Sequence, residues 1–171
     1  VAEAKNLPFR VQLDTTLPRA VTTDPKRLQQ ILKNLLSNAF KFTPQGGSVR
    51  LQMEQVDDRL TLQVQDSGSG IPEAQIQDLF SRFHHSADSA TGTGLGLALC
   101  KSLTEVLDGK IDLVSNSEEG AVFHVQIPLM VASNTETHTT ETHFQKLVSS
   151  FTPTSFDDHN VASDIEKPLI V

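Results

Sequence analysis

The chain has 171 residues, of which 37% are hydrophobic and 20% charged, and this composition is enough for one ordinary domain with a full core. Its formal net charge of −7 argues against a nucleic-acid partner, because neutralising phosphates requires a basic face. The single cysteine excludes an internal disulfide and a Cys-x-x-Cys metal site, and the lack of an apolar run of roughly 20 residues predicts no direct membrane contact.

The first part of the chain predicts a strand followed by an amphipathic helix. Alternating apolar and polar residues at 9–13 indicate a half-buried strand, and residues 20–22 are expected to pair beside it. Asp24 is a good helix N-cap, and Pro25 suits the first helical position. The helix should end at 43–47, which is rich in turn residues. Its core stripe is formed by Leu28, Ile31, Leu32, Leu35, Leu36 and Ala39.

The rest of the domain predicts a hairpin, a second helix and a final pair of strands. Residues 49–53 and 60–64 alternate in polarity and are joined by an acidic turn at 57–58. The second of these strands runs directly into Asp66. The later elements are, in order, a polar stretch at 72–93 with a short element at 80–83, a helix at 94–107 capped by Asp108-Gly109, and strands at 110–114 and 121–128.

Three polar side chains share one face of the first helix. Asn34, Asn38 and Lys41 are spaced by four and three residues, so they stack on a face that is offset from the leucine stripe. Two amides there could bind a hydrated divalent cation, and Lys41 could reach phosphate oxygens. An ordinary solvated polar face is the alternative. Asparagine is a poor residue in the middle of a helix, so two of them one turn apart call for an explanation and weaken that alternative.

A carboxylate stands where the second hairpin strand ends. Asp66 could accept a hydrogen bond from an exocyclic amine such as that of adenine, while Gly68 and Gly70 would let a flat ring approach. A calcium loop would need acids or amides at the third and fifth positions and Glu at the twelfth. Here the third and fifth positions are Gly68 and Gly70, the sixth is Ile71 and the twelfth is Gln77, so the segment does not match a calcium loop. A simple tight turn remains the alternative.

A glycine-rich segment opens the second helix. The amides near Gly92, Gly94 and Gly96, together with the helix dipole, would form an anion site. A dinucleotide fingerprint would need a third glycine where Leu97 stands, and a P-loop would need Gly-Lys-Ser/Thr, so neither motif is present. The segment is therefore a phosphate-binding glycine loop of another kind or a flexible hinge, and we expect both, with residues 84–93 acting as a mobile lid.

In this order, the three segments resemble the N box and the two glycine boxes of the catalytic and ATP-binding domain of sensor histidine kinases. Phe80 and Phe83 resemble the F box between the glycine boxes. This domain belongs to the GHKL superfamily, with gyrase, Hsp90 and MutL ATPases. The resemblance implies the Bergerat fold over residues 1–130. This fold is an α/β two-layer sandwich in which helices cover one face of a mixed, mostly antiparallel sheet.

The resemblance also implies ATP and Mg²⁺ as cofactors and assigns roles to residues. Asn38 would coordinate Mg²⁺ with Asn34 beside it, and Lys41 would contact phosphate. Asn34 and Lys41 would thereby serve the catalytic step. The other nucleotide-binding residues would be Phe42, Asp66, Gly68, Gly70 and Ile71 around the base, and Gly92, Thr93, Gly94, Leu95, Gly96 and Leu97 at the lid and the phosphates.

Asn34 bears on the reaction. Hydrolytic relatives carry a glutamate at this place to activate water, and an amide cannot act as a general base near neutral pH. We therefore expect a protein-histidine kinase domain that transfers the γ-phosphoryl group to a histidine on a separate dimerisation domain of the parent protein. None of the six histidines here is expected to be the acceptor. The alternatives are a degenerate ATP-binding regulatory module and, disfavoured by Asn34, a GHKL-type ATPase.

The composition changes near the end of the domain. Residues 131–166 are rich in Ser and Thr and predict a flexible linker, and residues 167–171 resemble the first strand of a receiver domain. The parent would then be a hybrid kinase, with that receiver or a response regulator as a partner. The chain does not begin with Met, so we expect it to be a piece of a longer protein. The expected location is cytoplasmic, although the parent could carry a membrane anchor.

Overall fold

The computed structural model describes residues 7–18, 21–81, 95–117 and 120–131. The proposed linker and receiver start therefore lie outside the described residues, apart from the backbone of Val131. The elements are, in chain order, β1 (Phe9–Leu13), β2 (Val21–Thr22), α1 (Pro25–Phe42), β3 (Val49–Val56), β4 (Arg59–Asp66), α2 (Glu73–Ile76), α3 (Gly96–Val106), β5 (Lys110–Ser117), β6 (Gly120–Pro128) and β7 (Met130–Val131).

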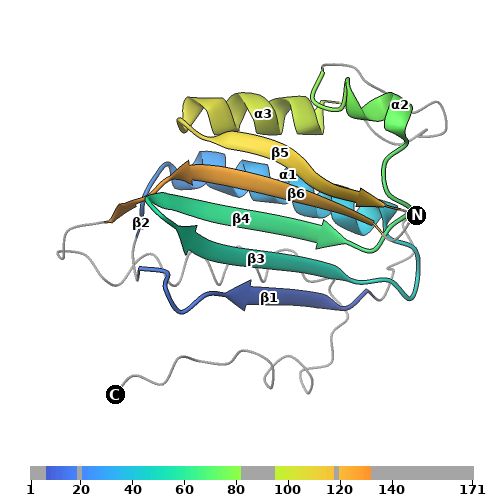
Figure 1. Ribbon diagram of the computed structural model, residues 1–171, viewed down its shortest axis with the longest axis horizontal. Helices are drawn as coiled ribbons and strands as arrows, with labels where there is room; N and C mark the ends of the chain where they lie inside the picture. Colours follow the sequence, from blue (N-terminus) through green and yellow to red (C-terminus); the bar gives the residue numbers. More distant parts are fainter. Residues whose placement is uncertain (1–6, 19–20, 82–94, 118–119, 132–171) are drawn as a thin grey trace.

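The main sheet has five strands in the order β1-β3-β4-β6-β5. β1 pairs in parallel with β3, and the other neighbours pair antiparallel. In Figure 1, α1 runs behind the sheet and α3 lies next to β5. This arrangement confirms the expected sandwich with a mixed, mostly antiparallel sheet. No helix in the described ranges is both long and apolar enough to span a bilayer.

The strand register separates an apolar face from a polar one. Leu51 pairs with Val64, which pairs with Phe123, and all three are buried on the side of the helices. The adjacent pair, Gln63 with His124, lies on the opposite face, where both residues are only partly buried. This period of two is the expected pattern for a sheet with one covered face.

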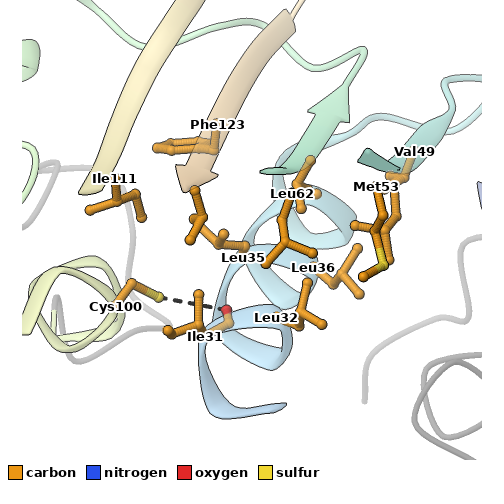
Figure 2. Close-up of a cluster of buried hydrophobic side chains, with 14 of the residues drawn as sticks. Ile31, Leu32, Leu35, Leu36, Val49, Met53, Leu62, Cys100, Ile111 and Phe123 are labelled. Atoms are coloured by element: carbon orange, nitrogen blue, oxygen red, sulfur yellow. Dashed lines mark hydrogen bonds between the residues drawn. The ribbon is translucent and has the colours of Figure 1, made fainter. Parts of the chain in front are cut away.

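The core lies between the sheet and α1. Figure 2 shows side chains of α1 meeting those of the sheet, with Cys100 of α3 at the edge of the cluster. The Cys100 thiol donates to the carbonyl oxygen of Ile31 at 3.7 Å, which joins α3 to α1. Of the predicted stripe, Leu28 is only partly buried. The fully buried members are Ile31, Leu32, Leu35, Leu36 and Ala39.

Both ends of α1 are as predicted. The Oδ1 atom of Asp24 accepts hydrogen bonds from the backbone N–H groups of Lys26 at 3.0 Å and Arg27 at 3.1 Å. Proline occupies the first helical position, where no backbone donor is needed. At the other end, the backbone N–H and the hydroxyl of Thr43 both donate to the carbonyl oxygen of Ala39.

A strand forms within residues 20–22 as expected, but its predicted pairing partner was wrong. β2 pairs antiparallel with β7, with Val21 opposite Val131, and forms a separate two-stranded sheet. β1 instead pairs in parallel with β3 at the edge of the main sheet. Alternation in a short strand indicates which face is buried but carries no information about the neighbouring strand.

Helix boundaries near the polar stretch also differ from the predictions. α3 begins at Gly96 instead of residue 94, and the short helix α2 lies at Glu73–Ile76, ahead of the element expected at 80–83. At the end of α3, Asp108 takes the left-handed conformation with φ 54°. The N–H of Gly109 donates to the carbonyl oxygen of Thr104 at 2.9 Å, which gives a Schellman ending with aspartate in the usual glycine position.

β5 is longer than predicted and contains a bulge. Leu113 pairs with Phe123, but Ser115 pairs with Val122, so the register shifts by one residue between them. Beyond the shift, Asn116 lies opposite Ala121 on the face that carries the helices. With uninterrupted pairing, the same residue would lie on the polar face.

Candidate functional site

Asp66 is a buried carboxylate at the end of β4. Its residue is 8% exposed and lies opposite Val49 on the helix side of the sheet. Its Oδ1 atom accepts from the backbone N–H of Gly68 at 2.9 Å and of Ala121 at 3.4 Å. Burial raises the pKa of the carboxyl, and these two hydrogen bonds lower it by less. Among the described residues nothing donates to Oδ2, so this oxygen can accept a hydrogen bond from a ligand.

The backbone around Asp66 is tightly packed. A Cβ atom on Gly68 would lie 2.7 Å from the carbonyl oxygen of Phe42, at the end of α1. Gly120 has φ +128°, and a Cβ atom there would lie 1.9 Å from the carbonyl oxygen of Asp66. Contacts within the protein therefore account for glycine at both positions, and they hold the segment after Asp66 between α1 and β6.

The same segment is attached to β5 through Gly70 and Ile71. Gly70 has φ +70°, and a Cβ atom on it would lie 2.1 Å from the carbonyl oxygen of Ser117. The backbone N–H of Ile71 donates to Oδ1 of Asn116 at 2.7 Å, and Nδ2 of Asn116 donates to the carbonyl oxygen of Ile71 at 2.7 Å. The segment is thus held at Gly68 by α1 and at Ile71 by β5.

Asn34 and Asn38 have different surroundings on α1. The Oδ1 atom of Asn34 accepts from Nε2 of Gln30 at 3.2 Å, and its Nδ2 atom donates to the carbonyl oxygen of Gly96 at 3.4 Å. Asn34 therefore joins α1 to the first residue of α3. The side chain of Asn38 is partly buried and forms no hydrogen bond with another described residue. Its amide oxygen is the one available for a ligand.

Lys41 and Phe42 lie at the C-terminal end of α1. The Lys41 ammonium lies 4.9 Å from the centre of the Phe42 ring, within cation–π range. The Phe42 residue is 51% exposed, so part of its side chain is open to solvent. The backbone carbonyl of Phe42 lies close to Gly68, so this end of α1 lies beside the segment that follows Asp66.

The start of α3 is the third part of the site. Leu95 is the N-cap residue, and no side chain caps the first turn. The first amides of a helix have no intrahelical acceptor, so they can bind an anion. A Cβ atom on Gly96 would have no heavy atom of the described residues within 4 Å. Packing among the described residues therefore does not require glycine at this position. Leu97 is partly buried against the core.

The remaining predicted site residues fall in the segment 82–94. Gly92, Thr93 and Gly94 lie outside the described residues, as do Phe83 and the proposed lid at 84–93. Phe80 is described, and its ring packs edge-to-face on Phe123 with centroids 6.5 Å apart. This contact attaches the chain to β6 shortly before the undescribed segment begins.

The donors on α1 are compatible with a magnesium ion bound mainly by phosphates. Mg²⁺ prefers oxygen ligands and usually keeps several waters. Asn38 offers an amide oxygen, whereas the oxygen of Asn34 already accepts from Gln30. Within the described ranges, no group of three His, Cys, Asp or Glu side chains could hold a metal ion. An ion here would therefore depend on Asn38 and on the oxygens of a bound ligand.

Several residues of the site were not found from the sequence. Gln30 and Asn116 act through contacts between distant elements, and neither lies in a recognisable motif. The motifs did not single out Gly120, and Ala121 contributes a backbone N–H that any residue except proline would supply. A register calculation with the bulge included could have placed Asn116 near Ile71, but alternation alone puts it on the other face.

Known proteins match the chain over the described domain. A family model described as "Histidine kinase-, DNA gyrase B-, and HSP90-like ATPase" matches residues 23–131. The circadian input-output histidine kinase CikA of Synechococcus elongatus is 49% identical over 127 residues, which cover 70% of this chain. The crystal structure of full-length ShkA in complex with AMPPNP has a TM-score of 0.66 at 30% identity, covering 75% of this chain and 27% of that chain.

A structure of similar extent is the nucleotide-free catalytic domain of the histidine kinase ThkA. It has a TM-score of 0.64 at 34% identity, covering 72% of this chain and 80% of that domain. By contrast, the chain spans 17% of the length of CikA. The family match includes α1, the segment after Asp66 and the start of α3. The chain therefore belongs to the histidine kinase-, DNA gyrase B- and HSP90-like ATPase family.

Proposed function

We propose that this domain binds Mg-ATP and donates the γ-phosphoryl group to a histidine on a separate dimerisation domain of its parent protein. The observation that carries the proposal is the buried Asp66 carboxylate, which has one oxygen held by backbone amides and the other without a described partner. Family membership and the AMPPNP bound to ShkA support a nucleotide as the ligand.

The adenine end of the ligand would lie at Asp66. Oδ2 would accept a hydrogen bond from the exocyclic amine, and the exposed ring of Phe42 would pack near the base. Gly68, Gly70 and Ile71 would form the adjoining wall through their backbone. Because Oδ1 is already bound to two amides, the carboxylate cannot rotate freely, which favours a defined position for the base.

The phosphate end would lie between α1 and α3. The uncapped amides at Leu95 to Leu97 would bind phosphate oxygens, together with the ammonium of Lys41. The amide oxygen of Asn38 would hold Mg²⁺, which would neutralise charge on the phosphates when bound. Gly92, Thr93 and Gly94 would complete this end within the lid.

Phosphoryl transfer fits this site better than hydrolysis. Asn34 cannot accept a proton near neutral pH, and its amide is bonded to Gln30 and Gly96. The domain thus lacks a base at the place where hydrolytic relatives carry one. In the proposed reaction, a neutral imidazole nitrogen attacks the γ-phosphorus, the bond to the β–γ bridging oxygen breaks, and ADP leaves. Catalysis would rest on positioning and charge neutralisation.

An apolar stripe on α3 would suit a helical partner. Leu95, Leu99 and Val106 lie on one face at helical spacing and are 38%, 42% and 58% exposed. This stripe begins at the phosphate end of the site, where an acceptor histidine must arrive. The proposed organisation is a catalytic domain at 1–130, a linker at 131–166 and the start of a receiver domain at 167–171.

Nucleotide binding is the first test. Titration with ATP and Mg²⁺ should raise the melting temperature, and Asn38→Ala should reduce this shift while leaving the ligand-free melting temperature unchanged. A second assay supplies the parent's histidine domain and labelled ATP. Label on that domain supports transfer, whereas binding without transfer supports a regulatory module. Rapid release of phosphate by this chain alone would support an ATPase, and the absence of any ATP-dependent shift would refute all three.

A further inference from the structure

Asn116 forms an unusually complete contact with the segment after Asp66. Its side-chain amide both accepts from the N–H and donates to the carbonyl oxygen of Ile71, with both distances 2.7 Å. One primary amide thus satisfies both backbone groups of one residue, as a neighbouring strand would. The contact continues the hydrogen-bonding of β5 onto a segment that is not itself a strand.

The bulge in β5 is what makes this contact available. The register shift between Leu113 and Ser115 places Asn116 opposite Ala121, on the face that carries Asp66. Regular pairing of the same residues would direct Asn116 to the polar face, away from Ile71. Bulges commonly redirect a side chain next to a functional site.

The contact also controls how closely the segment approaches the sheet. Gly70 lies so near Ser117 that a Cβ atom would be 2.1 Å from its carbonyl oxygen. Asp66 and Ile71 are the two ends of this short segment, and the first is fixed by β4. Asn116 is hydrogen-bonded to the second, so both ends of the segment are attached to the sheet.

We propose that Asn116 is a positioning residue of the nucleotide site that sets the selectivity for adenine over guanine. This inference rests on the proposed function, in which Oδ2 of Asp66 accepts from the exocyclic amine of adenine. Guanine presents a carbonyl oxygen at that place, which a carboxylate repels. The discrimination is strong only while the wall formed by Gly68 to Ile71 keeps the base in one position. When the Asn116 contact is lost, the base can shift and the discrimination falls.

Two variants of Asn116 distinguish the hydrogen bond that its side chain donates to Ile71 from the one that it accepts. Asn116→Leu keeps the approximate shape and removes both hydrogen bonds, whereas Asn116→Asp keeps the acceptor for the Ile71 N–H and loses the donor. Ser115→Ala is the matched control, because Ser115 is the exposed neighbour on the opposite face. If Asn116→Leu does not fold, Asn116→Asp decides the result.

The first measurement is amide hydrogen exchange in the ligand-free protein, which does not depend on nucleotide binding. Exchange at Gly68 and Ile71 should become about tenfold faster in Asn116→Leu and change less in Asn116→Asp. Amides in β4 should keep the wild-type rate, as should all amides in the control. Equal acceleration in β4 and in the segment, or no acceleration, would overturn the proposal, because Asn116 would then be a general structural residue or have no role.

The second measurement compares dissociation constants for ATP and GTP. Asn116→Leu should weaken ATP binding about tenfold and reduce the ratio of GTP to ATP dissociation constants by a similar factor. If the ratio were unchanged while local exchange became faster, the proposed role of Asn116 in selectivity would be overturned, but the proposal that the domain binds ATP would stand. If the wild-type protein itself failed to bind ATP, the proposed function would fail, and the inference with it.

Discussion

Replacing Asp66 by asparagine separates the binding role of this residue from its effect on stability. The substitution keeps Oδ1, so the hydrogen bonds from Gly68 and Ala121 can persist. It replaces Oδ2 by an NH₂ group, which would face the exocyclic amine of adenine with a second donor. A hydrogen bond to a charged group contributes about 1.5–3 kcal/mol, so the dissociation constant for ATP should rise by roughly 10- to 150-fold.

The effect on ATP-induced stabilisation follows from this change in affinity. At a ligand concentration of 100 times its dissociation constant, the wild-type protein gains about 2.7 kcal/mol. A variant that binds about 100-fold more weakly gains only about 0.4 kcal/mol at the same concentration. The assay is thermal unfolding of the variant and the wild-type protein with and without Mg-ATP.

Without ligand, burial of the Asp66 carboxylate should make the protein less stable as the pH rises. Burial raises the pKa of Asp66 above its ordinary value of 3.8, so the folded state binds a proton more tightly than the unfolded state. Its contribution to the free energy of unfolding therefore falls as pH rises from about 3.8 through the raised pKa. Asp66→Asn removes this dependence, so its stability at neutral pH should equal or exceed that of the wild-type protein.

A matched control is Asp57→Asn, in the turn at the far end of the hairpin. Asp57 is exposed and has φ 53°, a conformation that asparagine adopts readily. This variant should keep the wild-type ATP shift and the wild-type stability. If Asp66→Asn were stabilised by ATP as much as the wild-type protein, the adenine contact would be wrongly assigned. If this variant were much less stable than the wild-type protein at pH 7 without ligand, the claim that burial disfavours the ionised carboxylate would be refuted.

Three further predictions concern the surroundings of the site. Gly120→Ala should lower the free energy of unfolding by at least about 2 kcal/mol in urea titrations, since its Cβ atom would lie 1.9 Å from the carbonyl oxygen of Asp66; a loss below about 0.5 kcal/mol would contradict this geometry. The Cys100 thiol is buried, which raises its pKa to about 12, so iodoacetamide at pH 8 should label it only after unfolding. Rapid labelling of the folded protein would show that α3 opens readily. Gln30→Ala should weaken ATP binding several-fold with little change in melting temperature, because it releases the amide that joins α1 to α3. Gln29→Ala, at an exposed neighbour, should change neither quantity.

Local sequence patterns were sufficient for most of the fold. The cap at Asp24, the apolar stripe of α1 and the hairpin at 49–66 follow from interactions between residues close in sequence. The partner of β2 could not be predicted, because two residues carry too little information to select one of the six other strands in the described part of the chain. The bulge in β5 also escaped prediction, since nothing near Val114 in the sequence marks an extra residue.

The candidate site was predictable where it consists of sequence motifs and unpredictable where it consists of tertiary contacts. Asp66 was identified from its place at a strand end, and the structure buries it there. The sequence did not reveal that Gln30 occupies the oxygen of Asn34, because a glutamine one turn away on a helix surface has many possible partners. Nor did it reveal that protein contacts alone require glycine at position 68.

The length of α1 between two of its contacts sets a distance that a ligand would have to span. Gly68 lies against α1 at Phe42, and the carbonyl oxygen of Gly96 accepts a hydrogen bond from Asn34, so both glycines lie beside the same helix. These contacts are separated by eight residues, or about 12 Å along the helix axis. A ligand that reaches both glycines must match this distance, whereas a shorter molecule reaches one of them at a time. Length alone would therefore favour a nucleoside triphosphate over a nucleoside, before any individual phosphate contact is considered.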